Sequence, residues 1–171
     1  MSDKFVAICI MAILMAGITA CASTRVDDRH PLVREAPDSE VARVYFIRPR
    51  TERTMGFADN RLPVEADRFH LMTLAKGEYT MLPMVPGNVW ISVTSQTHWG
   101  PRHDVKEMSR SRQFNLKAGE TYFIVFNLVD GEFRGAFFEP EEVDIYMAKE
   151  LTRNMLPVGR ARKQPVSSLE G

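Results

Sequence analysis

The chain has 171 residues, with 22 basic and 22 acidic side chains, so its formal net charge is zero. Acids and bases alternate along the chain without forming a basic stripe, which argues against nucleic acid as a partner. The length is typical of a single domain that buries enough surface to fold unaided.

The N-terminal segment has the three-part layout of an export signal. A short polar start precedes an apolar run over residues 5–18, and small residues then lead to Cys21. The run stops short of the roughly 20 apolar residues that a membrane-spanning helix needs. We therefore expect a cleaved signal over residues 1–20. The alternative is an ordinary secretory signal followed by an incidental cysteine.

The residues Ile18, Thr19, Ala20 and Cys21 resemble the lipobox of bacterial lipoproteins. The resemblance implies that the Cys21 thiol receives a diacylglyceryl group, that the signal is cut between Ala20 and Cys21, and that the new amino terminus is acylated. Several acyl chains hold a protein stably at a membrane, whereas one chain holds only marginally. By the same resemblance, Ala22 after the cysteine implies the outer membrane, with the domain facing the periplasm.

Residues 22–40 are polar, contain two prolines and show no periodicity. Together with Cys21 they predict a lipidated, flexible tether over residues 21–40, with a root-mean-square span of about 25 Å. Order is expected from Val41 onward, where a β-rich run ends at Pro49. Turn residues then separate further strand candidates at 62–66, 69–75, 78–84, 89–94, 112–116, 121–128 and 133–138.

Three features of this second half refine the prediction. Residues 96–110 are expected to form a long polar loop. The run 121–128 is apolar on both faces, which is typical of a central strand. A helix is expected from about Glu141 or Asp144 to Asn154, because Val143, Met147 and Leu151 are four residues apart.

The C-terminal residues 156–171 are expected to be a disordered tail. The cations Arg160, Arg162 and Lys163 in it need no partner, although weak contact with an anionic lipid or polymer is an alternative. About seven strands without interleaved helices predict a mainly β domain over residues 41–155, an antiparallel β-sandwich of the prealbumin or Ig type with a C-terminal helix. An open barrel is the alternative.

Four short motifs follow one another in the sequence, namely Ala42–Pro49, Gly77–Tyr79 with Val85–Gly87, Leu116–Tyr122 and Ala148–Leu151. In these motifs and their order the chain resembles a family of short bacterial lipoproteins of unknown function. The similarity implies a prealbumin-like or carboxypeptidase-regulatory-like sandwich, and it brings no established reaction. Residues 65–68 depart from the family pattern, which has an Asp-Gly turn there.

A ligand site is suggested by Trp99 in the predicted loop, because its flat face could stack on a sugar ring while Arg102 and His103 supply hydrogen bonds. The alternative is that Trp99 is tucked under the loop. Trp90, on a predicted strand, is expected in the core.

Arginines 48, 50 and 53 surround Pro49 and could bind an anion through their guanidinium groups, although pairing with local carboxylates is favoured.

Metal sites are not expected. His98, His103, Asp104 and Glu107 match no zinc signature, so a solvated loop is favoured over metal binding. Met72, Met81 and Met84 could suit Cu(I), but filling gaps in a core without disulfides is favoured.

The motifs of common hydrolases and phosphate-binding proteins are absent from the sequence, and no cofactor is expected. The preferred hypothesis is therefore a non-catalytic, lipid-anchored envelope protein that binds another envelope protein. The alternatives are a module that binds peptidoglycan or surface polysaccharide through the Trp99 loop, and a hydrolase with convergent acids in a cleft.

Overall fold

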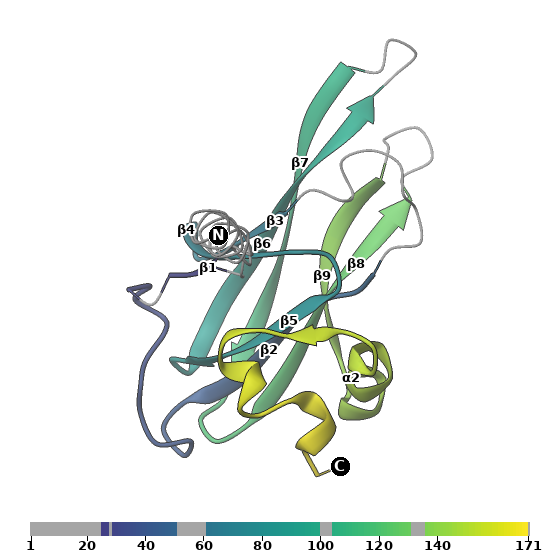
Figure 1. Cartoon of the computed structure of the whole chain (residues 1–171). Helices are drawn as coiled ribbons and strands as arrows, with labels where there is room; N and C mark the ends of the chain where they lie inside the picture. Colours follow the sequence, from purple (N-terminus) through teal and green to yellow (C-terminus); the bar gives the residue numbers. More distant parts are fainter. Residues whose placement is uncertain (1–24, 28, 51–60, 100–103, 131–135, 171) are drawn as a thin grey trace, which may run out of the picture.

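The computed structural model describes residues 25–27, 29–50, 61–99, 104–130 and 136–170. The described chain is mainly β, as predicted, and its strands form two five-stranded sheets (Figure 1). The first sheet has the order β1 (Arg25–Val26), β4 (Phe69–Leu74), β3 (Leu62–Ala66), β6 (Gly87–Trp99) and β7 (Asp104–Leu116). The second has the order β10 (Leu156–Pro157), β5 (Glu78–Met84), β2 (Ala42–Arg48), β8 (Thr121–Asp130) and β9 (Ala136–Val143).

The prediction of about seven antiparallel strands needs two corrections. The sheets hold more strands than expected, in part because the chain outside residues 41–155 adds β1 and β10. The pairs β2–β8 and β10–β5 are parallel, although the remaining pairs are antiparallel. Strand alternation in a sequence reports which residues face the core, but it does not report the direction of the neighbouring strand.

One hydrophobic core draws side chains from both sheets. Val44, Phe46 and Ile124 of the second sheet share it with Val64 and Ile91 of the first, and all five are fully buried. Met72 and Met84 lie in this core too, as gap-filling residues do.

A second cluster covers the other face of β2 and β8. Tyr45, Phe123 and Val125 pack there against Ala148 of the helix and Ala161 near the C-terminus. The continuous apolar run of β8 is thus buried on both faces, between β2 and β9, which confirms its predicted central position.

Helix α2 (Ile145–Thr152) begins directly after Asp144, the second of the two predicted starts, and ends two residues before the predicted Asn154. Residues 141–143 still pair with β8 as part of β9, so the helix cannot begin at Glu141. Asp144 is the N-cap, and its Oδ1 accepts a hydrogen bond of 2.8 Å from the Met147 N–H.

The predicted disordered tail is wrong. Residues 156–170 contain β10 and the 3-10 helices η2 (Gly159–Arg162) and η3 (Val166–Ser168), and they bury Val158, Ala161 and Val166. The Tyr45 hydroxyl donates a 2.9 Å hydrogen bond to the Gln164 carbonyl, which joins this segment to β2. Apolar residues spaced among the cations thus serve as its contacts with the sheet.

The predicted flexible tether is also wrong over its described residues. Arg25 and Val26 pair with Thr73 and Met72 in β4, and Val33 bridges to Met84. His30 is buried, where its Nε2 donates to the Ala66 carbonyl and its Nδ1 accepts from the Leu32 N–H. The segment is therefore packed against the domain.

The turn between β7 and β8 contains the motif Leu116–Tyr122, and hydrogen bonds of its side chains hold its shape. The Tyr122 hydroxyl donates to Glu120 Oε2 at 2.8 Å and accepts from the Lys117 N–H at 3.0 Å. Burial raises the pKa of Tyr122, and the hydrogen bond to Glu120 raises it further. The same hydrogen bond between Tyr122 and Glu120 lowers the pKa of Glu120. Gly119 has a φ of +79°, a conformation that favours glycine.

Candidate functional site

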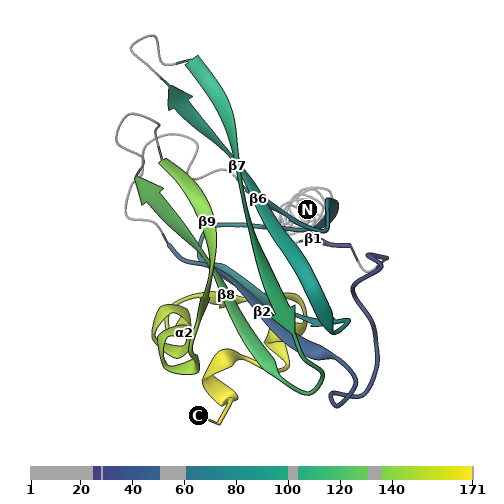
Figure 2. The same cartoon turned by 180° about the vertical axis from the view of Figure 1, so that it is seen from behind.

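The first sheet divides at the end of the molecule that lies opposite the helices. Strand β6 pairs with β3 only over Ile91–Val93, whereas it pairs with β7 along its whole length to Trp99 and Asp104. The outer part of the β6–β7 hairpin therefore projects past β3, in the same general direction as the β8–β9 hairpin (Figure 2). The predicted loop 96–110 is wrong, since its described residues belong to these two long strands.

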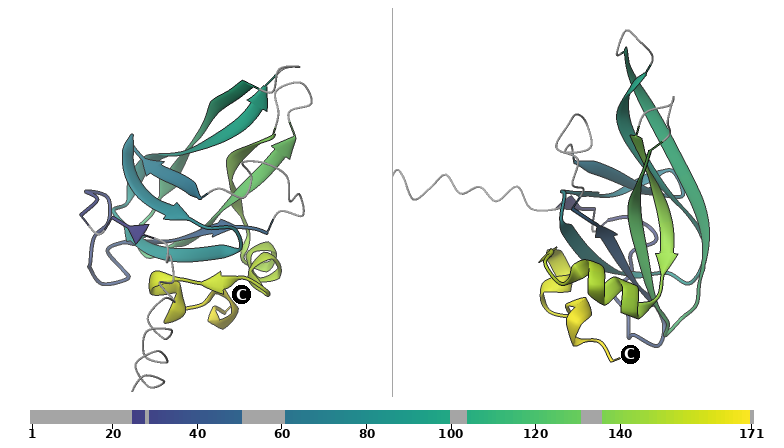
Figure 3. Two further views of the ribbon diagram at one scale, coloured as in Figure 1. Left: turned by 45° about the horizontal axis from the view of Figure 1, so that its top comes forward. Right: turned by 90° about the vertical axis from the view of Figure 1, so that its right-hand side faces the viewer.

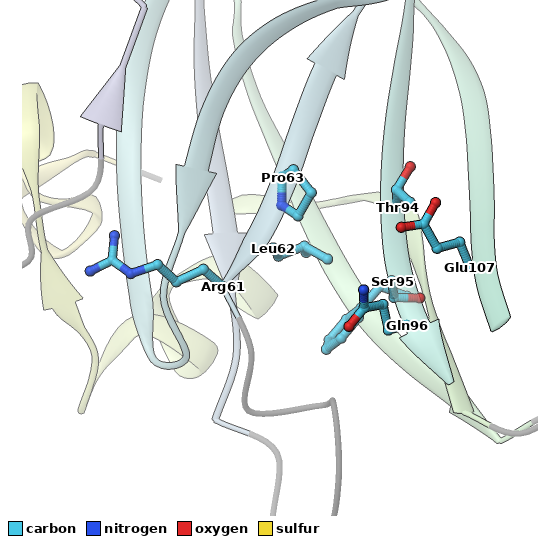
Figure 4. A pocket seen from close by; sticks show the side chains of 8 residues that line it. Arg61, Leu62, Pro63, Thr94, Ser95, Gln96 and Glu107 are labelled. Atoms are coloured by element: carbon cyan, nitrogen blue, oxygen red, sulfur yellow. The ribbon is translucent and has the colours of Figure 1, made fainter. Parts of the chain in front are cut away.

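The candidate functional site is a hollow of about 270 Å³ at this division (Figure 4). Its apolar wall comes from Leu62 and Pro63 at the start of β3 and from Phe138 of β9. Its polar wall comes from the β6–β7 hairpin. The polar residues are Thr94, Ser95, Gln96 and Glu107, and Arg61 completes the lining.

Strand alternation and register explain why three of these polar side chains share one face of the hairpin. Gln96 and Glu107 are directly opposed on β6 and β7 and therefore point to the same face, as does Thr94 two residues along β6. Figure 4 shows the Arg61 side chain extending away from the strands that carry Thr94 and Glu107. The hollow thus offers hydroxyl, amide and carboxylate groups beside an apolar wall.

The hollow is small and offers few groups that could take part in catalysis. Ligand pockets for drug-sized molecules have volumes of about 300–1,000 Å³, which places this hollow just below that range. Glu107 is the one acid among its described lining residues. Catalysis by paired carboxylates needs a second acid a few ångströms away. The arrangement can hydrogen bond a polar segment and pack against its apolar side chains.

Arg48 lies beside this hollow but inside the protein. Its side chain is fully buried, its Nη1 donates a 2.7 Å hydrogen bond to the Leu74 carbonyl, and its guanidinium lies over the Phe138 ring at 5.1 Å. Arg50 is exposed, and Arg53 lies outside the described residues. This geometry does not support an anion site built around Arg48. Its role is to join the ends of β2, β4 and β9.

The predicted sugar-binding residues lie at the tip of the same hairpin. Trp99 is the last residue of β6 and pairs with Asp104 through the backbone, but its side chain, Arg102 and His103 lie outside the described part. The structure therefore places the predicted Trp99 site and the hollow on one hairpin. Trp90 is half exposed on the outer face of β6, so its prediction as a core residue is wrong.

The other candidate sets are not brought together where they are described. Asp104 and Glu107 are three residues apart on a strand, so they point to opposite faces. Residues 25–27, 29–50, 61–99, 104–130 and 136–170 contain no group of three or more potential metal ligands. Met81 belongs to the second cluster, apart from Met72 and Met84 in the main core.

The sequence does not predict the hollow, because Gln96 and Glu107 fall in the expected loop 96–110 and its other residues are distributed over separate expected strands. The signal that could have found it is the run of β-branched and hydroxyl residues from Val93 to Thr97, which suits a pleated strand. The opposition of Gln96 and Glu107 depends on the register of the hairpin, which its turn sets.

Comparison with known protein families, curated proteins and solved structures returned no match. The resemblance to short bacterial lipoproteins and the lipobox therefore stay predictions. Within the described ranges, none of the helices has the length and apolar character that crossing a membrane requires.

Proposed function

We propose that the chain is a non-catalytic lipoprotein of the bacterial envelope, anchored through Cys21, whose β domain binds another envelope protein at the divided end of the first sheet. The two sheets would form a β-sandwich around their shared core. Ala22 favours the outer membrane, with the domain in the periplasm. The observation that carries the binding proposal is the unequal pairing of β6 with β3 and β7.

Strand pairing gives this surface its binding capacity. Beyond Val93, β6 has no strand partner on the side of β3 among the described residues. An exposed strand edge can accept an extended segment from another protein, since backbone hydrogen bonds supply affinity and side-chain pockets supply specificity. The hollow formed by Leu62, Phe138 and Gln96 would receive a side chain of that segment.

In-cell photocrosslinking tests the proposal. A photoreactive residue in place of Gln96 should give a protein adduct, and the same residue in place of Gln113, on β7 near the other end of the hairpin, should not. Gln96→Lys should remove a partner that Gln113→Lys retains. Adducts with lipid alone at position 96, or equal adducts at both positions, would contradict the proposal.

Glycan binding is the second candidate, since Thr94, Gln96 and Glu107 could hydrogen bond sugar hydroxyls on the hairpin that ends in Trp99. This function predicts that Trp99→Ala lowers the amount of protein retained by purified peptidoglycan. Unchanged retention, with Trp90→Ala as the matched control, would exclude it.

A further inference from the structure

The packed N-terminal segment places the domain close to its anchor. Arg25 of β1 already pairs with Thr73 of β4, and only three residues lie between Arg25 and Cys21. A chain of four residues spans at most about 14 Å when fully extended. If Cys21 is lipidated, as the proposed function holds, the domain cannot stand far from the membrane and must lie against it.

The direction of β1 shows where the chain enters the domain. Because β1 is antiparallel to β4, the chain enters it from the end of β4 that carries Thr73 and Leu74. This end continues through Lys76 and Gly77 into β5, and the Gly77 carbonyl accepts a 2.9 Å hydrogen bond from the Leu156 N–H of β10. The same end of β4 pairs with Leu62 and Pro63 at the start of β3. The chain thus enters the domain between the start of β3 and the edge of the C-terminal layer at Leu156.

The C-terminal layer is residues 145–170, which comprise α2, β10, η2 and η3 and gather at one end of the molecule, away from the β6–β7 hairpin (Figure 3). This layer carries five cations and two acids, a net of three positive charges in a chain that is neutral as a whole. Arg153 pairs with Glu150, and Arg160 pairs with Glu35.

Three further cations of the C-terminal layer stand in no ion pair within the described ranges, namely Lys149, Arg162 and Lys163.

The same layer exposes apolar side chains. Tyr146 is 72% exposed, Leu156 is 53% exposed and Met147 is 51% exposed. A hollow of about 550 Å³ lies between α2 and the C-terminal segment, lined by Tyr79, Tyr146 and Lys149 among others. Aromatic and apolar groups interspersed with cations are the composition of surfaces that bind the headgroup region of a bilayer.

We propose that the C-terminal layer is the membrane-docking face of the domain, which rests on anionic phospholipid headgroups through Lys149, Arg162 and Lys163 and inserts Tyr146, Met147 and Leu156 at the interface. Docking would fix the orientation of the domain, with the outer part of the β6–β7 hairpin directed away from the bilayer (Figure 3). The hairpin would then be open to a partner, because the layer and the hairpin lie at opposite ends.

Depth-dependent quenching tests the orientation. The lipidated mature chain, whose Cys21 sulfur is blocked, is given one new cysteine by Leu156→Cys, Arg68→Cys or Ser111→Cys. Each cysteine is labelled with bimane, and the chain is placed in phosphatidylethanolamine–phosphatidylglycerol vesicles that contain doxyl lipid. We expect quenching at position 156 and little at positions 68 and 111. Quenching at 68 or 111 instead, or at none of the three, would overturn the proposal.

The charge contribution is measured separately on the Cys21→Ser chain, which has no lipid. Each Lys or Arg near an anionic surface strengthens binding about fivefold, so Lys149→Glu, Arg162→Glu and Lys163→Glu together should weaken binding to phosphatidylglycerol vesicles at least about 100-fold. The matched triple change at Arg68, Lys106 and Arg112 should leave binding unchanged. Equal losses in both variants would contradict the proposal.

The two experiments separate this inference from the proposed function. Intact mass of the chain used for quenching shows whether Cys21 carries lipid. Lipid on Cys21 with no quenching at position 156 refutes docking and leaves the anchor in place. Absence of lipid refutes the anchor and, with it, the argument from the short link.

Discussion

Replacing Tyr45 by phenylalanine tests how the C-terminal segment is held to the second sheet. The change removes the hydroxyl that donates to the Gln164 carbonyl at 2.9 Å and preserves the ring that stacks on Phe123 at 5.3 Å between centroids. A hydrogen bond of this kind contributes about 1 kcal/mol. At pH 8 we therefore expect Tyr45→Phe to lower the free energy of unfolding by about that amount.

The pH dependence of this difference has a definite sign. Burial raises the pKa of Tyr45 from 10.0 to about 12, against a smaller lowering effect of Arg43. The folded state therefore favours the protonated phenol. The resulting stabilisation is complete below pH 10 and is lost as the pH rises toward 12. At pH 11, which lies one unit above the ordinary pKa of 10.0, tyrosine should have lost about 1.4 kcal/mol of stability relative to phenylalanine. One pKa unit corresponds to about 1.36 kcal/mol.

The two effects have similar size, so the stabilities of the native chain and Tyr45→Phe should cross near pH 11. Urea unfolding followed by circular dichroism at pH 8, 10 and 11 measures this. Tyr146→Phe is the matched control, because Tyr146 is largely exposed, and it should differ little from the native chain at each pH. A difference for Tyr45→Phe that stays constant from pH 8 to pH 11 would show that the folded state does not raise the pKa of Tyr45.

Three further substitutions test contacts elsewhere in the domain. Arg48→Ala should lower the free energy of unfolding by about 3 kcal/mol or more, because a fully buried side chain and its hydrogen bond to the Leu74 carbonyl are lost. Denaturant unfolding measures this, with Arg50→Ala as the control. Asp144→Ala should cost about 1 kcal/mol in thermal or urea unfolding, through loss of the N-cap of α2. Tyr122→Phe should raise the pKa of Glu120 toward its ordinary value in an NMR titration, and an unchanged pKa would contradict the hydrogen bond as its cause.

The strands that sequence reasoning located well are those whose pattern reports burial directly. The strand 78–84 has the predicted bounds, and β8 lies centrally because its apolar residues face two clusters at once. The direction of β2 relative to β8 could not be predicted in this way, since a parallel neighbour leaves the same alternation in each strand.

The errors concern segments whose composition is polar but whose positions are fixed by a few contacts. Residues 29–40 are held by His30, Leu32 and Val33, and residues 156–170 by Val158, Ala161 and Val166. A few apolar residues in a polar, proline-containing stretch carry no clear period. Their partners lie more than 30 residues away, so only the folded structure brings them together.

The candidate site could not be predicted from the sequence for a related reason. Each residue of the hollow is ordinary by itself, and the site exists because β6 leaves β3 after Val93 while it stays paired with β7. The predicted Trp99 site lies at the tip of that same hairpin, which keeps the protein-binding and glycan-binding proposals on one surface.

The anchoring of this domain at the membrane depends on lipid at a single cysteine, and the intact mass of the protein purified from a bacterial host measures that modification. We expect a chain that begins at Cys21 and carries the mass of a diacylglyceryl group and a further acyl chain, with Cys21→Ser lacking both. A secreted chain that begins at another residue, or one that retains a free thiol at Cys21, would show that the domain is not anchored through Cys21.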